Sequence, residues 1–97
     1  MYARVTRWEG GDPDAVRAAT EEMVSNAGDG PPPGVPAKGF TYLVDADNGR
    51  TLAIGLFETE EDLQTGDKAL NEMNPSRDDA GKRVSVEVYE VPIDLRL

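Results

Sequence analysis

Two residues of opposite charge are the best candidates for acid–base chemistry in this chain. Arg4 lies in an N-terminal segment, and Glu87 lies in a segment near the C-terminus. If these segments are neighbouring antiparallel strands with both residues on one face, the two side chains form an ion pair. As a catalytic site, the arginine would stabilise an enolate or phenolate and the glutamate would act as the base. The alternative is a buried ion pair without a catalytic role.

Four aromatic side chains are candidate contacts for a substrate. Trp8, the only tryptophan, suits stacking on a planar ligand, although an anchor in the core or in a dimer interface is the alternative. Tyr42 and Tyr89 offer hydroxyl groups to a substrate carbonyl, or else pack across strands with satisfied hydroxyls. Phe57 would complete the apolar lining.

Composition excludes several kinds of chemistry. The chain has no cysteine, which excludes disulfides, thiolate catalysis and iron–sulfur clusters. It has no histidine, the commonest general base and metal ligand. The acidic pairs Asp45–Asp47 and Asp78–Asp79 lack the spacing of a calcium loop and are typical of turns. We therefore expect neither a metal site nor a cofactor.

Charge and hydropathy limit the partners. The net charge is -9, from 19 acidic and 10 basic residues, which argues against nucleic acid and anionic membranes. The N-terminal segment has no apolar core of a signal peptide, and no run approaches the ~20 apolar residues of a membrane span. We expect a soluble cytoplasmic protein with one domain over residues 1–97.

These residues must be positioned by strands and helices, and the middle of the chain is the clearest part. Apolar runs at 40–44 and 51–58 flank Asn48-Gly49, which predicts a two-residue hairpin turn. Thr59, with Asp62 three residues later, predicts a capped helix over 60–73. Gly66 in its middle would allow close packing on a sheet.

The outer parts of the chain complete the pattern. Asp12-Pro13 predicts a helix from 13 to about 26, with an apolar stripe of Val16, Ala19, Met23, Val24 and Ala27. Alternation predicts strands at 2–8 and 83–91. The proline-rich segment 28–38 is a stiff connection or, alternatively, the rim or lid of a pocket.

The element order βαββαβ predicts a ferredoxin-like α+β fold: a four-stranded antiparallel sheet with two helices on one face. We expect the aliphatic sets of the third and fourth strands beneath the helices. The other face would be aromatic and mixed, with Tyr42 or Leu43 among its residues. The set for that face is Arg4, Thr6, Trp8, Phe57, Ser85, Glu87 and Tyr89.

A face of this kind predicts a second copy of the chain as its cover. The C-terminal tail, with Ile93, Leu95 and Leu97 alternating with charged residues, is strand-like to its last residue. We expect it to pack on the neighbouring subunit. The predicted partner is thus the chain itself, joined through the helix-free sheet face and the tail.

The segment Phe57 to Leu63, together with the element order and a tryptophan near the end of the first strand, resembles the antibiotic-biosynthesis-monooxygenase-like group of dimeric α+β barrels. This resemblance implies a homodimeric barrel and, in some members, cofactor-independent oxygenation of aromatic, polyketide-like substrates. The haem-degrading members hold iron with a histidine, which this chain lacks. The predicted function is therefore small-molecule binding with monooxygenase-like chemistry; the alternative is a non-catalytic dimeric ligand-binding or interaction module.

Overall fold

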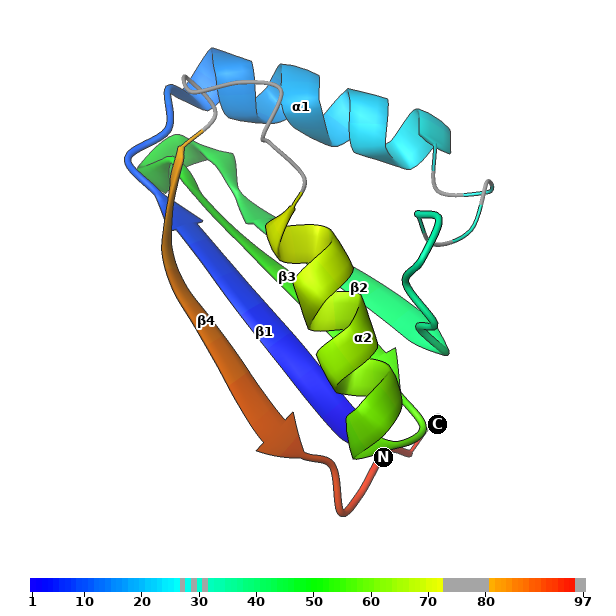
Figure 1. Cartoon of the computed structure of the whole chain (residues 1–97). Helices are drawn as coiled ribbons and strands as arrows, with labels where there is room; N and C mark the ends of the chain where they lie inside the picture. The colour runs from blue at the N-terminus through cyan, green and yellow to red at the C-terminus, as the bar shows by residue number, and fades with distance from the viewer. Residues whose placement is uncertain (27, 29, 31, 73–80, 96–97) are drawn as a thin grey trace.

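The structure is a computed structural model that describes residues 1–26, 28, 30, 32–72 and 81–95. One helix lies along a twisted four-stranded sheet and another crosses the end of the sheet (Figure 1). In chain order the elements are β1 (Tyr2–Glu9), α1 (Pro13–Asn26), β2 (Gly39–Asp45), the 3-10 turn η2 (Ala46–Asn48), β3 (Arg50–Phe57), α2 (Glu60–Asn71) and β4 (Lys82–Glu90).

The strands form an antiparallel sheet in the order β2-β3-β1-β4. β1 and β3 occupy the centre, and β2 and β4 are the two edges. This is the ferredoxin-like fold predicted from the order of the elements.

Both helices begin where the sequence predicts. The Ala15 N–H donates to Asp12 Oδ2 at 3.2 Å, and α1 starts at Pro13. The Asp62 N–H donates to Thr59 Oγ1 at 3.1 Å, which makes Thr59 the N-cap of α2. In each helix a side-chain oxygen satisfies one of the N–H groups that lack a partner in the first turn.

The turn between β2 and β3 differs from the prediction. The strands are joined by η2 and Gly49 instead of a two-residue turn. Asn48 does not adopt the positive φ that such a turn needs. Its side chain donates to Asp45 Oδ2 at 2.9 Å, which supports the longer turn. Gly49 has a φ of 64°, and a Cβ there would lie 2.1 Å from the carbonyl oxygen of Gly11, so only glycine fits.

The core is built around Phe57, between β3 and α2. Phe57 is fully buried and clusters with Val35 and Leu63. Gly66 of α2 lies directly over its ring, because a Cβ there would come within 2.5 Å of Phe57 Cε1. The predicted role of Gly66 in close packing is therefore confirmed.

The proline-rich loop does more than connect α1 to β2. Its Val35 is buried in the core, and the Lys38 N–H donates to the Leu56 carbonyl at 2.7 Å. The described part of the loop is thus fixed to β3. The alternative role as the rim or lid of a pocket stays a prediction.

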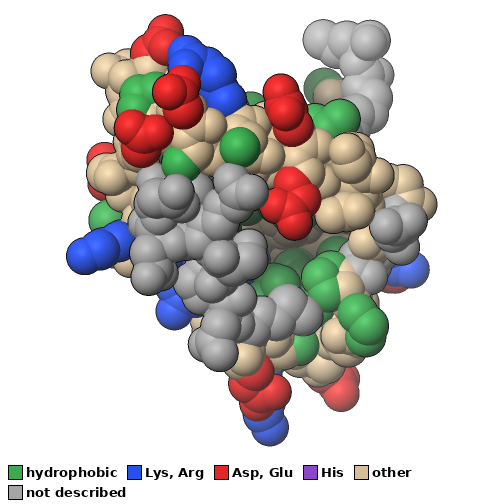
Figure 2. All heavy atoms as spheres, turned by 90° about the horizontal axis from the view of Figure 1, so that it is seen from above, with side chains coloured by type: hydrophobic (Ala, Val, Ile, Leu, Met, Phe, Trp, Pro, Cys, Tyr) green, Lys and Arg blue, Asp and Glu red, His purple; other side chains and the backbone are tan. Residues whose placement is uncertain are grey.

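α1 covers little of the sheet and packs mainly against η2 (Figure 1). Val16 is fully buried, but Met23 and Val24, from the same predicted stripe, are exposed. Seen from above, this end of the molecule shows acidic side chains beside exposed hydrophobic ones (Figure 2). Ala27 and Met73, the ends of the two predicted helical patterns, lie outside the described residues.

The aliphatic side chains of β3 lie on the face opposite to the predicted one. Arg4 of β1 donates to Asp67 of α2, so Arg4 faces α2. Val5 therefore points away from α2, and Val5 pairs with Ile54 of β3. The resulting helix-free face carries Ala3, Val5, Arg7, Thr41, Leu43, Leu52, Ile54, Leu56, Ser85, Glu87 and Tyr89.

The reason for this difference is the room that α2 needs. Ala53 and Gly55 lie on the α2 side of the sheet, and their small size leaves space for the single large ring of Phe57. The prediction was correct for β4, since Val86 and Val88 pair with the α2-facing side of β1. Because both faces of β3 are apolar, alternation alone did not distinguish them.

Candidate functional site

Arg4 is buried beneath α2, and its three guanidinium nitrogens are all engaged. Nε donates to Asp67 Oδ1 at 2.7 Å, Nη1 to Thr6 Oγ1 at 2.9 Å and Nη2 to Asn71 Oδ1 at 3.1 Å. Asn71 Oδ1 also accepts from Arg83 at 2.8 Å. The network joins β1, α2 and β4, so Arg4 acts as a structural clamp in the single chain.

The predicted ion pair between Arg4 and Glu87 does not form. Their strands are antiparallel neighbours, as predicted, but the ladder pairs Arg4 with Val88 and Glu87 with Val5. Arg4 and Glu87 therefore point to opposite faces of the sheet. The prediction placed Arg4 and the other alternate side chains of β1 on the wrong face of the sheet. Because side chains alternate between the two faces, a shift of one residue produces this error.

Glu87 instead belongs to a polar cluster on the helix-free face. It accepts from Arg7 Nε at 3.0 Å, from Ser85 Oγ at 3.5 Å and from the Tyr89 hydroxyl. The hydrogen bond from Tyr89, followed by that from Arg7, lowers the pKa of Glu87, and the same bond to Glu87 raises the pKa of Tyr89. A lowered pKa makes the carboxylate a weaker base, contrary to its predicted role.

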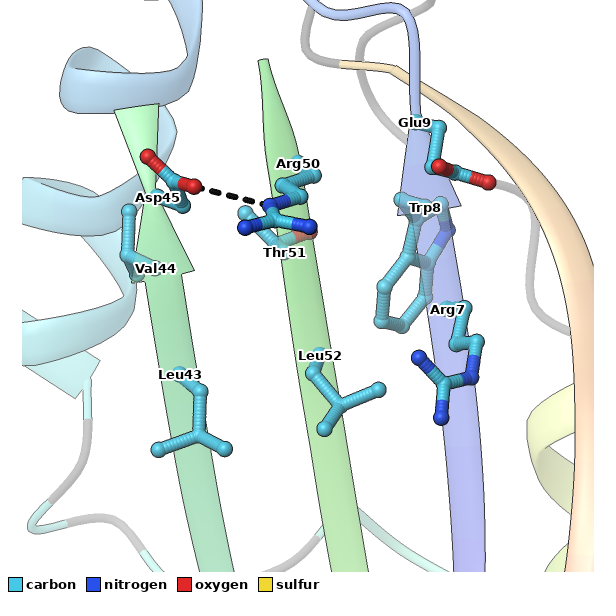
Figure 3. Close-up of a pocket in the computed structure, with 9 residues that line it drawn as sticks. All are labelled: Arg7, Trp8, Glu9, Leu43, Val44, Asp45, Arg50, Thr51 and Leu52. Carbon is cyan, nitrogen blue, oxygen red and sulfur yellow. Dashed lines mark hydrogen bonds and ion pairs between the residues drawn. The ribbon is translucent and has the colours of Figure 1, made fainter. Parts of the chain in front are cut away.

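Trp8 lines a shallow, open depression of about 250 Å³ near one end of the sheet (Figure 3). Leu43 and Leu52 form its apolar part, and Arg7 and Arg50 lie at its sides. The Arg50 Nε donates to Asp45 Oδ2 at 2.8 Å. Enclosed ligand pockets usually measure ~300–1,000 Å³. In the single chain this depression is too open to bury a ligand.

The other predicted ligand contacts lie elsewhere. Tyr42 is on the α2 side of β2 and stacks on Phe40, with ring centroids 6.4 Å apart and an interplanar angle of 18°. Phe57 is fully buried in the core. Tyr89 lies with Glu87 on the helix-free face. The six predicted residues therefore do not converge on one pocket.

Apart from Trp8, none of the lining residues was predicted as a site residue; Arg7, Leu43, Leu52 and Arg50 are among those missed. The signal was present, because placing Leu52 on the helix-free face would have placed its ladder partner Arg7 there as well. These residues were omitted because the side chains of β1 and β3 were assigned to the wrong face of the sheet, and not because their residue types were overlooked.

In the part of the chain that the structure describes, no three acidic side chains are close enough to hold a metal ion. Asp45 accepts hydrogen bonds from Asn48 and Arg50, which lower its pKa in that order of importance. Asp78 and Asp79 lie outside the described residues. None of the described helices has the length and apolar character needed to cross a membrane.

The fold is shown by the strand order, whereas the family is not. Comparisons with protein-family models, curated proteins and solved structures gave no match to this chain. The resemblance to the antibiotic-biosynthesis-monooxygenase-like group, which rests on element order and on the segment Phe57 to Leu63, stays a prediction. The function of the chain must therefore be argued from its own surfaces.

Proposed function

We propose that this chain is a homodimeric binding module for small planar molecules, in which two copies pack through their helix-free faces. The observation that supports the proposal is the composition of that face. Leu43 is 48% exposed, and Leu52, Ile54 and Leu56 are half-buried without any helix over them. A sheet that meets water on one side normally carries polar side chains there. An aliphatic strip of this kind is typical of an interface.

The charges on the helix-free face favour a second copy as the cover. The whole chain carries a net charge of -9, so its surfaces generally repel one another. On the helix-free face, however, Arg7 forms an ion pair with Glu87 at 3.0 Å. Where β2 ends and β3 begins, Arg50 forms an ion pair with Asp45 at 2.8 Å. Two such faces meet with little net repulsion and with their apolar strips in contact.

A second sheet would also complete the ligand site. Packed sheets lie ~10 Å apart, so the partner would cover the open side of the Trp8 depression. An apolar cavity with an indole and guanidinium groups suits a planar, phenolic compound. The proposal includes the cytoplasmic location expected from the sequence, which cell fractionation would test.

Binding is proposed in place of turnover because Arg4 and Glu87 face opposite sides of the sheet. The oxygenase activity implied by the resemblance has no support from their positions. With a panel of anthrones and hydroquinones we expect no oxygen uptake above buffer. Turnover that is lost in Glu87→Gln would contradict the non-catalytic proposal.

The dimer is tested by placing a charge at the centre of the helix-free face. Ile54→Lys lowers the net negative charge, so a weaker dimer in this variant cannot come from added general repulsion. We expect its dissociation constant to rise at least about 100-fold, because a charge would be buried in the contact. The control is Val88→Lys, on the opposite face of β4, which should dimerise as the native chain does. Sedimentation velocity measures both, and circular dichroism checks that each variant is folded.

Ligand binding is followed by the fluorescence of Trp8, since no other tryptophan contributes. We expect planar phenols to quench it in the native dimer and to bind at least about tenfold more weakly to Ile54→Lys, because that variant leaves the depression open. Equal binding by the monomeric variant would show that the partner does not complete the site.

A further inference from the structure

The two edges of the sheet differ in how well they are protected. β4 carries Lys82, Arg83, Glu87 and Glu90 and has an irregular register opposite Arg7 and Trp8. Charged side chains and bulges are the usual means of blocking further strand pairing. One edge of the sheet is therefore closed to another strand.

β2, at the other edge, has no such protection. Its residues from Gly39 to Val44 include no charged side chain and no proline, and its ladder with β3 is regular. Phe40 is 57% exposed and Leu43 48% exposed. In the described part of the chain, no segment pairs with the outer side of β2. A long, uncharged free edge of this kind accepts an added strand.

The tail after β4 has the properties of such a strand. Pro92 disfavours the helical conformation at Val91 and favours an extended one, and proline is tolerated at the start of an edge strand. Ile93 and Leu95 are each 74% exposed, the most exposed large hydrophobic side chains described. The Val91 N–H donates to the Met1 carbonyl at 2.9 Å, so the tail leaves the sheet beside β1, far from β2 of the same chain. The described tail, residues 91–95, is not a strand in the single chain.

We propose that the tail of each subunit adds as a fifth strand to the free edge of β2 in the partner copy. This inference rests on the proposed face-to-face dimer. With a two-fold axis parallel to the strands, the order β2-β3-β1-β4 places the partner's β4 over β2. The partner's tail then begins beside the edge that needs it. Ile93 and Leu95 share one side of an extended strand and would continue an apolar surface of the sheet.

Cross-linking tests where the tail binds, and the absence of native cysteine makes the result unambiguous. Leu95→Cys and Thr41→Cys chains, one of them isotopically labelled, are mixed at low micromolar concentration and treated with a short bis-maleimide. We expect a cross-linked species that contains one chain of each kind. The control replaces Thr41→Cys with Thr65→Cys on the exposed side of α2 and should give none. Equal cross-linking to both positions, or to neither, would overturn the inference.

Truncation measures how much the tail contributes. A chain that ends at Val91 should remain folded, and its dimer dissociation constant should rise at least about 100-fold, because Ile93 and Leu95 of both tails lose their contacts. Hydrogen exchange should become faster at β2 amides and stay unchanged at β4. A full-length chain that is monomeric refutes the dimer itself. A full-length dimer that truncation leaves unaltered refutes only the exchange of tails.

Discussion

Phe57 and Gly66 determine how closely α2 approaches the sheet. The ring has no exposed surface, and a Cβ on Gly66 would lie 2.5 Å from Cε1 and 2.8 Å from Cζ. Gly55 adjoins the same ring, since a Cβ there would lie 3.3 Å from Phe57 Cε2. At this contact the usual preference for alanine over glycine in a helix is reversed.

Gly66→Ala is therefore expected to destabilise the protein although alanine is the better helix former. The helix gains ~1 kcal/mol from propensity, whereas overpacking of a core typically costs ~1–3 kcal/mol. Urea unfolding followed by circular dichroism should show a lower midpoint. The control, Thr65→Ala on the exposed side of α2, should raise the midpoint slightly, and adding Phe57→Leu to Gly66→Ala should restore part of the loss. A stabilised Gly66→Ala would show that the ring has other space.

The polar cluster on the helix-free face makes stability depend on pH. Since hydrogen bonds lower the pKa of Glu87 in the folded chain, its contribution is present above the unfolded pKa and is lost as the pH falls through the folded value. The raised pKa of Tyr89 has the opposite effect on stability. The contribution of the Tyr89 hydroxyl to the free energy of unfolding is present below its unfolded pKa and is lost at alkaline pH.

We expect Glu87→Gln to be less stable than the native chain at pH 7, and we expect this difference to shrink as the pH falls through the lowered pKa of Glu87. The measurement is the urea midpoint at several pH values and one protein concentration. Thr65→Ala, on the exposed side of α2, is the control and should stay parallel to the native chain, because it removes no titratable group. A difference between Glu87→Gln and the native chain that stays constant down to the most acidic pH at which both remain folded would contradict the assignment.

At the residue scale the sequence identified the unusual side chains but not their surroundings. Trp8, Arg4 and Glu87 are all in structured positions, yet only Trp8 lines a depression. Two of the three partners of Arg4, Asp67 and Asn71, are on α2, more than 60 positions along the chain. Neither residue spacing nor composition predicts contacts over such a separation, because these contacts depend on the angle at which α2 packs on the sheet.

At the scale of the elements, α2 is held to the sheet by charge as well as by Phe57. Arg4 and Asp67 form an ion pair at 2.7 Å, with 7% of the Arg4 side chain and 35% of the Asp67 side chain exposed. Removing the carboxylate leaves the buried guanidinium without its counter-charge, which is more costly than removing both groups.

Asp67→Ala is expected to cost about 2–3 kcal/mol, the lower end for a broken buried pair because water partly screens Asp67. The double variant Arg4→Met, Asp67→Leu should be less destabilised than Asp67→Ala alone. Chemical unfolding measures both, with Lys68→Ala on the exposed side of α2 as the control. If the double variant is the less stable of the two, the network contributes more than the desolvation argument allows.

The positions of the helices and strands were the features best predicted from the sequence. Helix starts at Asp12-Pro13 and Thr59 were predicted because a cap is a local hydrogen bond between neighbouring residues. The turn was predicted less well, since Asn48 bonds back to Asp45 and lengthens it. The choice between two apolar faces failed because it depends on the fit between Phe57 and α2, which is not local.

At the scale of the whole molecule, correcting the face strengthens the case for association. The sequence predicts an aromatic, mixed surface on the helix-free side of the sheet. The structure places the aliphatic side chains of β3 on that side instead. The requirement for a cover is therefore greater than the sequence suggested. We propose a second copy as that cover because the charges on this face of an acidic chain are balanced, and this is the central proposal for the protein.

The most direct test of that claim is sedimentation equilibrium of the native chain at micromolar concentration. Two copies joined through their helix-free faces should give twice the 10.5 kDa mass of one chain. The Ile54→Lys variant, folded by circular dichroism, should give the mass of a single chain. A native chain that sediments as a folded monomer would contradict the sheet-to-sheet dimer and, with it, the proposed binding site and exchanged tails.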